Sequence, residues 1–301
     1  MHNSHGKNPN LNHVDERFRG LVAASSAEKF AHLAAEWFIP NPKSQSVIDA
    51  IKSLLFMPPR KPPMNLVISG PSGCGKSTSI KKLTNTLAQS YICNELVQKP
   101  AVVLNIPKSL DETDLLLNLM TEMVGEFERD GSVSDLQGYA DKMLIDMHVK
   151  VVIIEATDNF VGAPAAQIKA LLSAVEMLAA RAGVSIVLVV TPDVEVLIAN
   201  SDAQAFAASR VEVGYFDNDA EFQNLLADFE RLIPLPEPSM LSYYDMSSLI
   251  HMLTNGNLAA IKELIVKSAT IAINYGDPSI NNGHIYAYAT RKSIMDSLSF
   301  G

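Results

Sequence analysis

The sequence predicts an α/β protein: a three-layer domain with a parallel central sheet, followed by a small all-helical lid. Three observations lead to this prediction. A complete Gly-x-x-x-x-Gly-Lys-Ser pattern occupies residues 70–77, between an apolar run fit for a strand and a helical stretch. Later apolar runs are continuous, as in parallel strands that are covered on both faces. Beyond residue 215 the pattern is helical throughout.

The elements follow from hydrophobic periodicity and from the breaks between periodic segments. The expected strands cover 65–69, 101–106, 149–154 and 184–190, and the helices of the α/β part cover 27–38, 44–56, 77–88, 114–127, 133–147 and 164–182. The expected lid helices are 218–232, 241–254, 258–274 and 280–296. The expected domains are a flexible arm at 1–25, an α/β domain at 26–216 that begins with a helical linker region at 26–60, and the lid at 217–301.

Composition narrows the class of protein. A chain of 301 residues can bury one large core and a smaller one. No stretch approaches 18 uninterrupted apolar residues and the first 13 residues have no apolar signal core, so we expect a cytoplasmic protein without membrane contact. The two cysteines have no metal-ligand spacing. A formal net charge of −9 argues against a basic surface over the whole molecule but leaves room for a local basic stripe.

The glycine pattern predicts a site for the phosphates of a nucleotide, with ATP and Mg²⁺ as cofactors. Its glycines allow successive backbone N–H groups to point at phosphate oxygens, and the start of the following helix adds a favourable dipole. We expect Lys76 to neutralise the β and γ oxygens and the Ser77 hydroxyl to bind magnesium. The residues expected to contact the nucleotide are Gly70, Pro71, Ser72, Gly73, Cys74, Gly75, Lys76, Ser77 and Thr78.

An apolar strand that ends in acid supplies the second half of such a site. Here the strand ends in Glu155, which can reach the hydration shell of the metal, and is followed by Ala156. Proteins of this type usually place a second carboxylate at that position to activate the attacking water. Its loss removes about 10²- to 10⁴-fold of rate unless Asp158 takes over the role. We therefore expect slow or absent hydrolysis.

The order and spacing of these features resemble those of one family. Glu36-Trp37-Phe38-Ile39-Pro40-Asn41-Pro42, Met64 to Pro71, the acidic strand end and Ser209-Arg210-Val211 are similar to segments of the TniB/TnsC family. Its members are AAA+ ATPases of bacterial transposons and are related to the Mu B target-selection protein. The similarity covers about residues 30–290, so the resemblance implies an AAA+ fold for most of the chain.

The resemblance also implies roles for individual residues. Arg210 matches the arginine finger that reaches the γ-phosphate bound by the neighbouring subunit, and Thr191 matches a polar sensor of that phosphate. Phe38 and Ile39 lie where family members hold the adenine base. Ala259 stands where many AAA+ proteins carry a sensor arginine, with Lys262 as the nearest substitute.

Family members assemble with ATP as rings or helical filaments on double-stranded DNA and contact a transposase and a TniQ-type adaptor. The resemblance places a DNA contact in the loop after the second strand, where Lys108 lies. Lys61 and Lys150, with Arg60, are weaker candidates. One lysine per subunit becomes a basic track when it is repeated along a filament.

The resulting expectation is an ATP-binding regulator of transposition that oligomerises on target DNA, recruits a transposase and hydrolyses ATP weakly. Two alternatives remain open at this point. The first is an active ATPase of the initiator or helicase-loader type, such as IstB, with Asp158 as the base. The second is a nucleotide-gated protein scaffold that does not bind DNA.

Overall fold

The structure is a computed structural model that describes residues 11–58, 60–90, 98–126, 132–156, 160–200 and 209–299. The chain divides into two compact units. The α/β unit comprises Pro42–Gly214, and the helical unit combines Met1–Asn41 with Tyr215–Gly301. Over the described ranges, no helix has both the length and the apolar character needed to cross a membrane.

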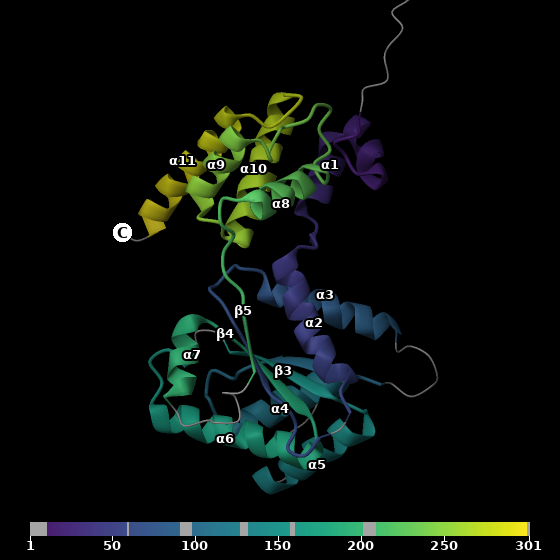
Figure 1. Cartoon of the computed structure of the whole chain (residues 1–301), viewed down its shortest axis with the longest axis vertical. Helices are drawn as coiled ribbons and strands as arrows, with labels where there is room; N and C mark the ends of the chain where they lie inside the picture. Colours follow the sequence, from purple (N-terminus) through teal and green to yellow (C-terminus); the bar gives the residue numbers. More distant parts are fainter. Residues whose placement is uncertain are drawn as a thin grey trace, which may run out of the picture. The chain divides into compact units, whose positions relative to one another are not determined.

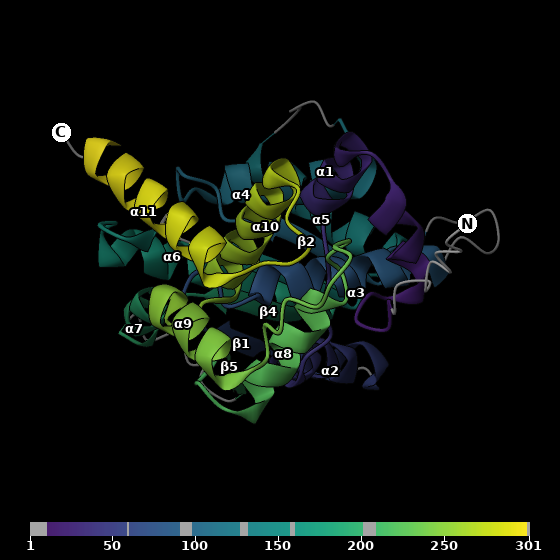
Figure 2. The ribbon, with the colours of Figure 1, turned by 90° about the horizontal axis from the view of Figure 1, so that it is seen from above.

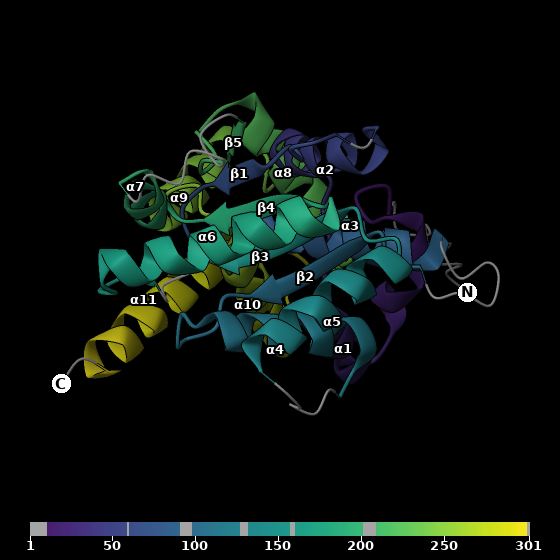
Figure 3. The same ribbon diagram turned by 90° about the horizontal axis from the view of Figure 1, so that it is seen from below.

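A five-stranded parallel sheet forms the middle layer of the α/β unit (Figure 3). Each strand pairs in parallel with its neighbours, and the order from edge to edge is β2 (Ala101–Asn105), β3 (Val151–Ala156), β4 (Ser185–Val190), β1 (Leu66–Ser69) and β5 (Arg210–Glu212). The residues of β1 are all buried, and those of β3 and β4 nearly all. The continuous apolar runs of the sequence therefore reflect a sheet that is covered on both faces.

Helices cover the two faces of this sheet (Figures 1 and 3). One face packs against α2 (Pro42–Phe56) and α3 (Lys76–Ser90). The other face forms a large apolar cluster with α4 (Glu112–Val124), α5 (Val133–Asp146) and α6 (Ala165–Ala182), and α7 (Pro192–Ala199) follows β4. The predicted three-layer α/β fold is confirmed.

The helical unit is built around α10 (Leu258–Tyr275), which contacts helices on several sides (Figure 2). Its partners are α1 (Ser26–Ala34), α9 (Tyr244–Thr254) and α11 (Asn282–Ser299), and α8 (Ala220–Glu230) packs against α9. Apolar residues from all of these helices share one buried cluster. The all-helical character predicted for the C-terminal part is thus confirmed.

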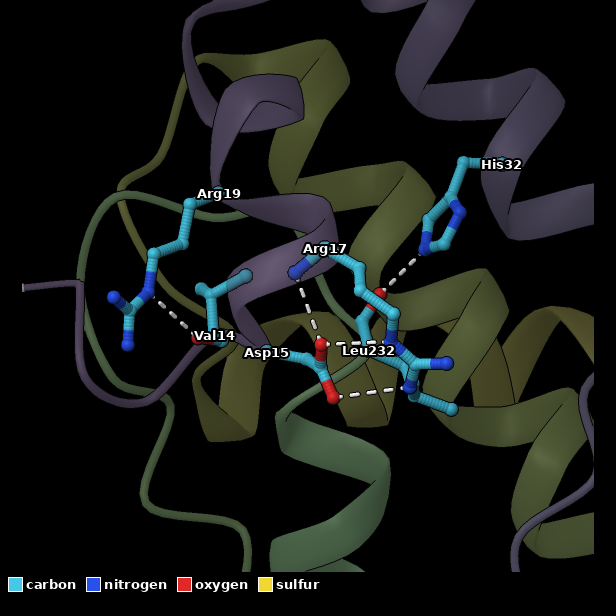
Figure 4. Close-up of polar contacts among 6 residues, drawn as sticks. All are labelled: Val14, Asp15, Arg17, Arg19, His32 and Leu232. Carbon is cyan, nitrogen blue, oxygen red and sulfur yellow. Dashed lines mark hydrogen bonds and ion pairs between the residues drawn. The ribbon is translucent and has the colours of Figure 1, made fainter.

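An N-terminal segment belongs to the helical unit as well (Figure 4). The His32 ring nitrogen Nε2 lies 2.7 Å from the Leu232 carbonyl oxygen, and the Asp15 backbone N–H donates to the Arg231 carbonyl at 2.8 Å. Asp15 also caps the 3₁₀-helix η1 (Glu16–Ala23). Hydrogen bonds from Arg17 hold the pKa of the Asp15 carboxyl down at about 2.

The two units differ from the domain boundaries expected from the sequence. Residues 1–25 were expected to form a flexible arm and residues 26–60 to belong to the α/β domain. In the structure the described residues up to Asn41 group with the helical unit. The physical reason is burial, because Leu33 and Ile39 lie in the apolar cluster of the helical unit, with Trp37 packed against it.

Candidate nucleotide site

The glycine loop joins β1 to α3 and has the backbone that its sequence requires. Gly73 has φ of 79° and Gly75 has φ of 102°, in the left-handed region that side chains disfavour. At Gly70 an added Cβ would lie 2.2 Å from the Val213 carbonyl oxygen, which is far inside contact distance. The loop therefore needs glycine at its base for close packing and at its turns for conformation.

The charged and hydroxyl groups of the loop lie at the start of α3. Lys76 is buried, and its ammonium group donates hydrogen bonds to the carbonyl oxygens of Gly70 and Pro71. Ser77, in the first turn of α3, is exposed. A buried positive charge inside a glycine loop, beside the free N–H groups of a helix start, fits a polyphosphate.

The acidic strand end faces the same side of the sheet as this helix. Alternate residues of β3, including Ala156, belong to the apolar cluster under α4, α5 and α6. Because side chains alternate along a strand, Glu155 points to the opposite face, which α2 and α3 cover. Glu155 is half-buried. Its carboxylate and the Ser77 hydroxyl are oxygen ligands of the kind that Mg²⁺ prefers.

Ala156 has no exposed surface and lies within the apolar cluster. A side chain at this position points away from the face that carries Glu155. Asp158, the predicted substitute base, lies outside the described residues. The part of the site that the structure describes thus contains one carboxylate at the end of β3.

Asn105 is a polar neighbour of the site that the sequence analysis missed. It ends β2 directly opposite Glu155 in the parallel register, so the two side chains share a face. Asn105 is exposed, and the residue after it donates its backbone N–H to the Glu155 carbonyl oxygen at 3.1 Å. In the sequence, Asn105 is only a polar residue at the end of an apolar run. Its position next to Glu155 can be recognised only when β2 is known to pair with β3.

Thr191 follows the last residue of β4 and is the N-cap of α7. Val190 lies opposite both Ser69 and Ala156 in the register, and its carbonyl accepts the Gly70 N–H at 3.2 Å. The structure therefore brings Thr191, Glu155 and the glycine loop together along the carboxyl edge of the sheet. This edge is where open parallel sheets bind ligands.

Arg210 has its backbone back from that edge, although its side chain bonds Glu212, which lies opposite Ser69 at the end of β1. It begins β5 opposite Val67, three residues before the glycine loop, which is about 10 Å along a strand. Its guanidinium forms ion pairs with Glu195 of α7 at 2.9 Å and with Glu212 at 2.8 Å. Within one chain, these carboxylates occupy Arg210.

The candidate DNA contacts are spread over the α/β unit. Lys108 is exposed in the turn after β2, and Arg60 and Lys61 are exposed in the segment before β1. Lys150 donates a hydrogen bond to the Leu55 carbonyl at 3.2 Å, at the C-terminal end of α2. This contact gives Lys150 a structural role at a helix end.

The remaining predicted residues belong to the helical unit. Ile39, a candidate for adenine contact, is buried in the apolar cluster of that unit, and Phe38 precedes it. Lys262 places its ammonium group 5.8 Å from the centre of the Trp37 ring. Lys262 thus makes a cation–π contact, and its role as a sensor stays a prediction.

Comparisons with known proteins agree with this fold. The sequence matches the family of bacterial TniB proteins over residues 29–216, more than half of the chain. No curated protein sequence is significantly similar. Among solved structures, Cdc6p from Pyrobaculum aerophilum has 17% identity and a TM-score of 0.60, with 83% of this chain and 67% of that chain covered.

Two further structures have the same fold. The Aeropyrum pernix ORC1 protein, solved in complex with DNA, has 12% identity and a TM-score of 0.56, with coverage of 87% and 69%. Domain III of the Thermotoga maritima replication initiation protein DnaA has 14% identity and a TM-score of 0.52, with coverage of 85% and 92%. At these identities the likeness establishes the AAA+ fold alone.

Proposed function

Because the chain belongs to the TniB family and has an AAA+ fold with a complete phosphate loop, we propose that it is an ATP-dependent regulator of transposition. In this proposal the protein binds ATP with Mg²⁺, oligomerises on double-stranded DNA, and recruits a transposase, with a TniQ-type adaptor as a further partner. In this proposal, the binding of ATP, rather than its hydrolysis, determines whether the protein is assembled.

The phosphate site supports nucleotide binding. The glycine loop offers backbone N–H groups, Lys76 offers a buried positive charge, and Ser77 and Glu155 offer oxygen ligands for the metal. A bound Mg²⁺ would neutralise charge on the β and γ oxygens. The neutral polar groups of Thr191 and Asn105 lie along the same edge, where they can orient water or a phosphate oxygen.

The observation that carries the proposal is the separation of Glu155 and Ala156 onto opposite faces of β3. The residue available for metal binding is in place, while the next position is filled by a small apolar side chain in the core. No base can act from position 156, so bound ATP is cleaved slowly unless Asp158 supplies one.

Oligomerisation is proposed through Arg210. The Cα of this residue lies about 10 Å along the sheet from the start of the glycine loop, its guanidinium is held by carboxylates of its own chain, and its side chain is half-exposed. Those properties suit a residue that acts on the γ-phosphate held by a neighbouring protomer. DNA contact is proposed through Lys108, with Lys61, Lys150 and Arg60 as weaker contributors.

One experiment tests nucleotide binding, DNA binding and oligomerisation together. Purified protein is mixed with duplex DNA, with and without a non-hydrolysable ATP analogue, and is imaged by electron microscopy. We expect regular oligomers on DNA only with the analogue, none with Lys76→Ala, and DNA affinity that falls steeply as salt rises. Lys108→Ala should weaken binding, while Lys169→Ala on α6 serves as a charge-matched control. Steady turnover at about 1 s⁻¹ or faster would contradict slow hydrolysis.

One alternative is favoured by a specific observation. The solved structures with this fold include a domain of a replication initiation protein, so an active initiator- or loader-type ATPase with Asp158 as its base is the second candidate. Turnover that is rapid in the wild type and abolished in Asp158→Ala would favour it. Oligomers that form with ATP but bind no DNA at low salt would instead indicate a protein scaffold.

A further inference from the structure

Arg210 is held by carboxylates on two different elements of its own chain. Its Nε lies 2.9 Å from Oε1 of Glu195, and its terminal nitrogen NH2 donates to Oε2 of the same carboxylate at 3.1 Å. The NH2 group also lies 2.8 Å from Oε1 of Glu212. The first contact is a bidentate pair, the strongest arrangement that an arginine makes with a carboxylate.

The two carboxylates differ in how firmly they are placed. Glu195 lies one helical turn after Thr191, donates its backbone N–H to the Thr191 carbonyl, and has a side chain that is 17% exposed. Glu212 lies two residues after Arg210 on the same face of β5, and its side chain is 70% exposed. Glu195 is thus the more enclosed partner, and Glu212 is the more exposed one.

The two carboxylates make the net charge around Arg210 negative instead of positive. Two carboxylates and one guanidinium carry a net charge of −1, so an approaching triphosphate meets a negative group rather than a positive one. Both Nε and NH2 already donate to carboxylates. Phosphate binding by these nitrogens therefore requires at least one carboxylate to leave.

We propose that Glu195 and Glu212 form a carboxylate latch on Arg210, which opens only when the triphosphate of a neighbouring protomer replaces a carboxylate. The proposal rests on the proposed role of Arg210 as an arginine finger. The carboxylates compete with the triphosphate for Arg210, so the latch raises the ATP concentration at which assembly begins. Because Glu195 is one turn from Thr191, the latch also connects the carboxyl edge of β4 to the finger.

The latch is tested by neutralising each carboxylate separately. Glu195→Gln and Glu212→Gln remove one charge each and keep the shape of the side chain. The matched control is Asp193→Asn, which removes a charge from the first turn of the same helix, where the exposed Asp193 lies apart from the contacts of Arg210. The readout is the ATP concentration that gives half-maximal assembly on duplex DNA, followed by light scattering.

Exposed or partly exposed ion pairs are worth a factor of about two to five in an equilibrium. We expect both glutamine variants to assemble at an ATP concentration about two- to fivefold lower than the wild type, and Asp193→Asn to match the wild type. Unchanged or higher ATP requirements in the glutamine variants would overturn the latch. If Arg210→Ala abolishes assembly in that case, the finger proposal survives; wild-type assembly by Arg210→Ala overturns both proposals.

Discussion

Restoring a second carboxylate to the end of β3 should destabilise the protein strongly rather than activate it. Ala156→Glu recreates the usual pair of acids, yet Ala156 has no exposed surface and lies in the apolar cluster. A glutamate enclosed in this way has a pKa near 8–9. Its ordinary pKa is about 4.3, so keeping it protonated at pH 7 costs about 3.7 kcal/mol at 1.36 kcal/mol per unit. Overpacking adds about 1–3 kcal/mol.

The expected loss of unfolding free energy at pH 7 is therefore about 5–7 kcal/mol, a large part of the stability of a typical domain. The sign of the pH dependence follows from the raised pKa. Below pH 4.3 the carboxyl is protonated in both states and its charge contributes nothing. Between that value and the folded pKa, only the unfolded state ionises, so the destabilisation grows with pH.

Urea denaturation at pH 5 and pH 7 measures this difference, with Ala156→Gln as the control of equal size. Between these two pH values, the gap in unfolding free energy between the glutamate and glutamine variants should widen by about 2.7 kcal/mol. Equal stability of the two variants at both pH values would show that position 156 reaches water. Faster ATP turnover by the glutamate variant would refute the assignment of this position to the core.

Three other perturbations have defined outcomes. Gly70→Ala should weaken binding of an ATP analogue by at least tenfold in calorimetry, because the added Cβ would overlap the Val213 carbonyl. The control is Gly138→Ala in α5, where no atom lies within 4 Å of the added Cβ. This variant should bind the analogue normally and be slightly more stable than the wild type. Glu230→Gln should cost about 2–4 kcal/mol in thermal unfolding, because the buried carboxylate accepts three backbone N–H groups of the loop before α9, and an amide presents only one oxygen to them. Hydrogen bonds from Lys292 and then Tyr288 lower the pKa of Glu263, so their stabilisation is present above the ordinary glutamate range and is lost as the pH falls below it. The protection free energy of the α11 amides, calculated relative to the intrinsic exchange rate at each pH, should fall between pH 5 and pH 3 in the wild type but not in Glu263→Gln. The decrease should be under about 1 kcal/mol because the pair is partly exposed.

The elements with strong hydrophobic patterns were predictable from the sequence. Strands β1 to β4 and helices α2 to α6 lie close to their expected ranges, because each has either a continuous apolar run or a repeated apolar face. The glycine loop could be placed because its conformation demands particular residues at particular spacings. The four lid helices followed from the breaks at Asn255-Gly256 and at the prolines between them.

The elements that were missed have weak local signals. The strand β5 has three residues, none fully buried, and its pairing with β1 depends on tertiary structure. The helix α7 is only eight residues long, and η1 buries no residue of its own. The described residues before Asn41 group with the helical unit, and no local sequence pattern predicts this grouping. It depends on contacts between residues that are more than 190 positions apart in the sequence, such as His32 and Leu232.

The strand order and the alternation of faces explain why a motif alone described the site incompletely. In the sequence alone, Glu155-Ala156 looks like the usual pair of consecutive acids with the second acid missing. In the structure the two positions face different layers: Glu155 shares a face with Asn105 and with the helix that carries Lys76, while Ala156 completes the core under α4 to α6. A substitution that enlarges Ala156 therefore perturbs stability first and chemistry second. For the same reason, any base that cleaves ATP in this protein has to come from outside β3, and the candidates are residues after the strand or residues of a neighbouring protomer.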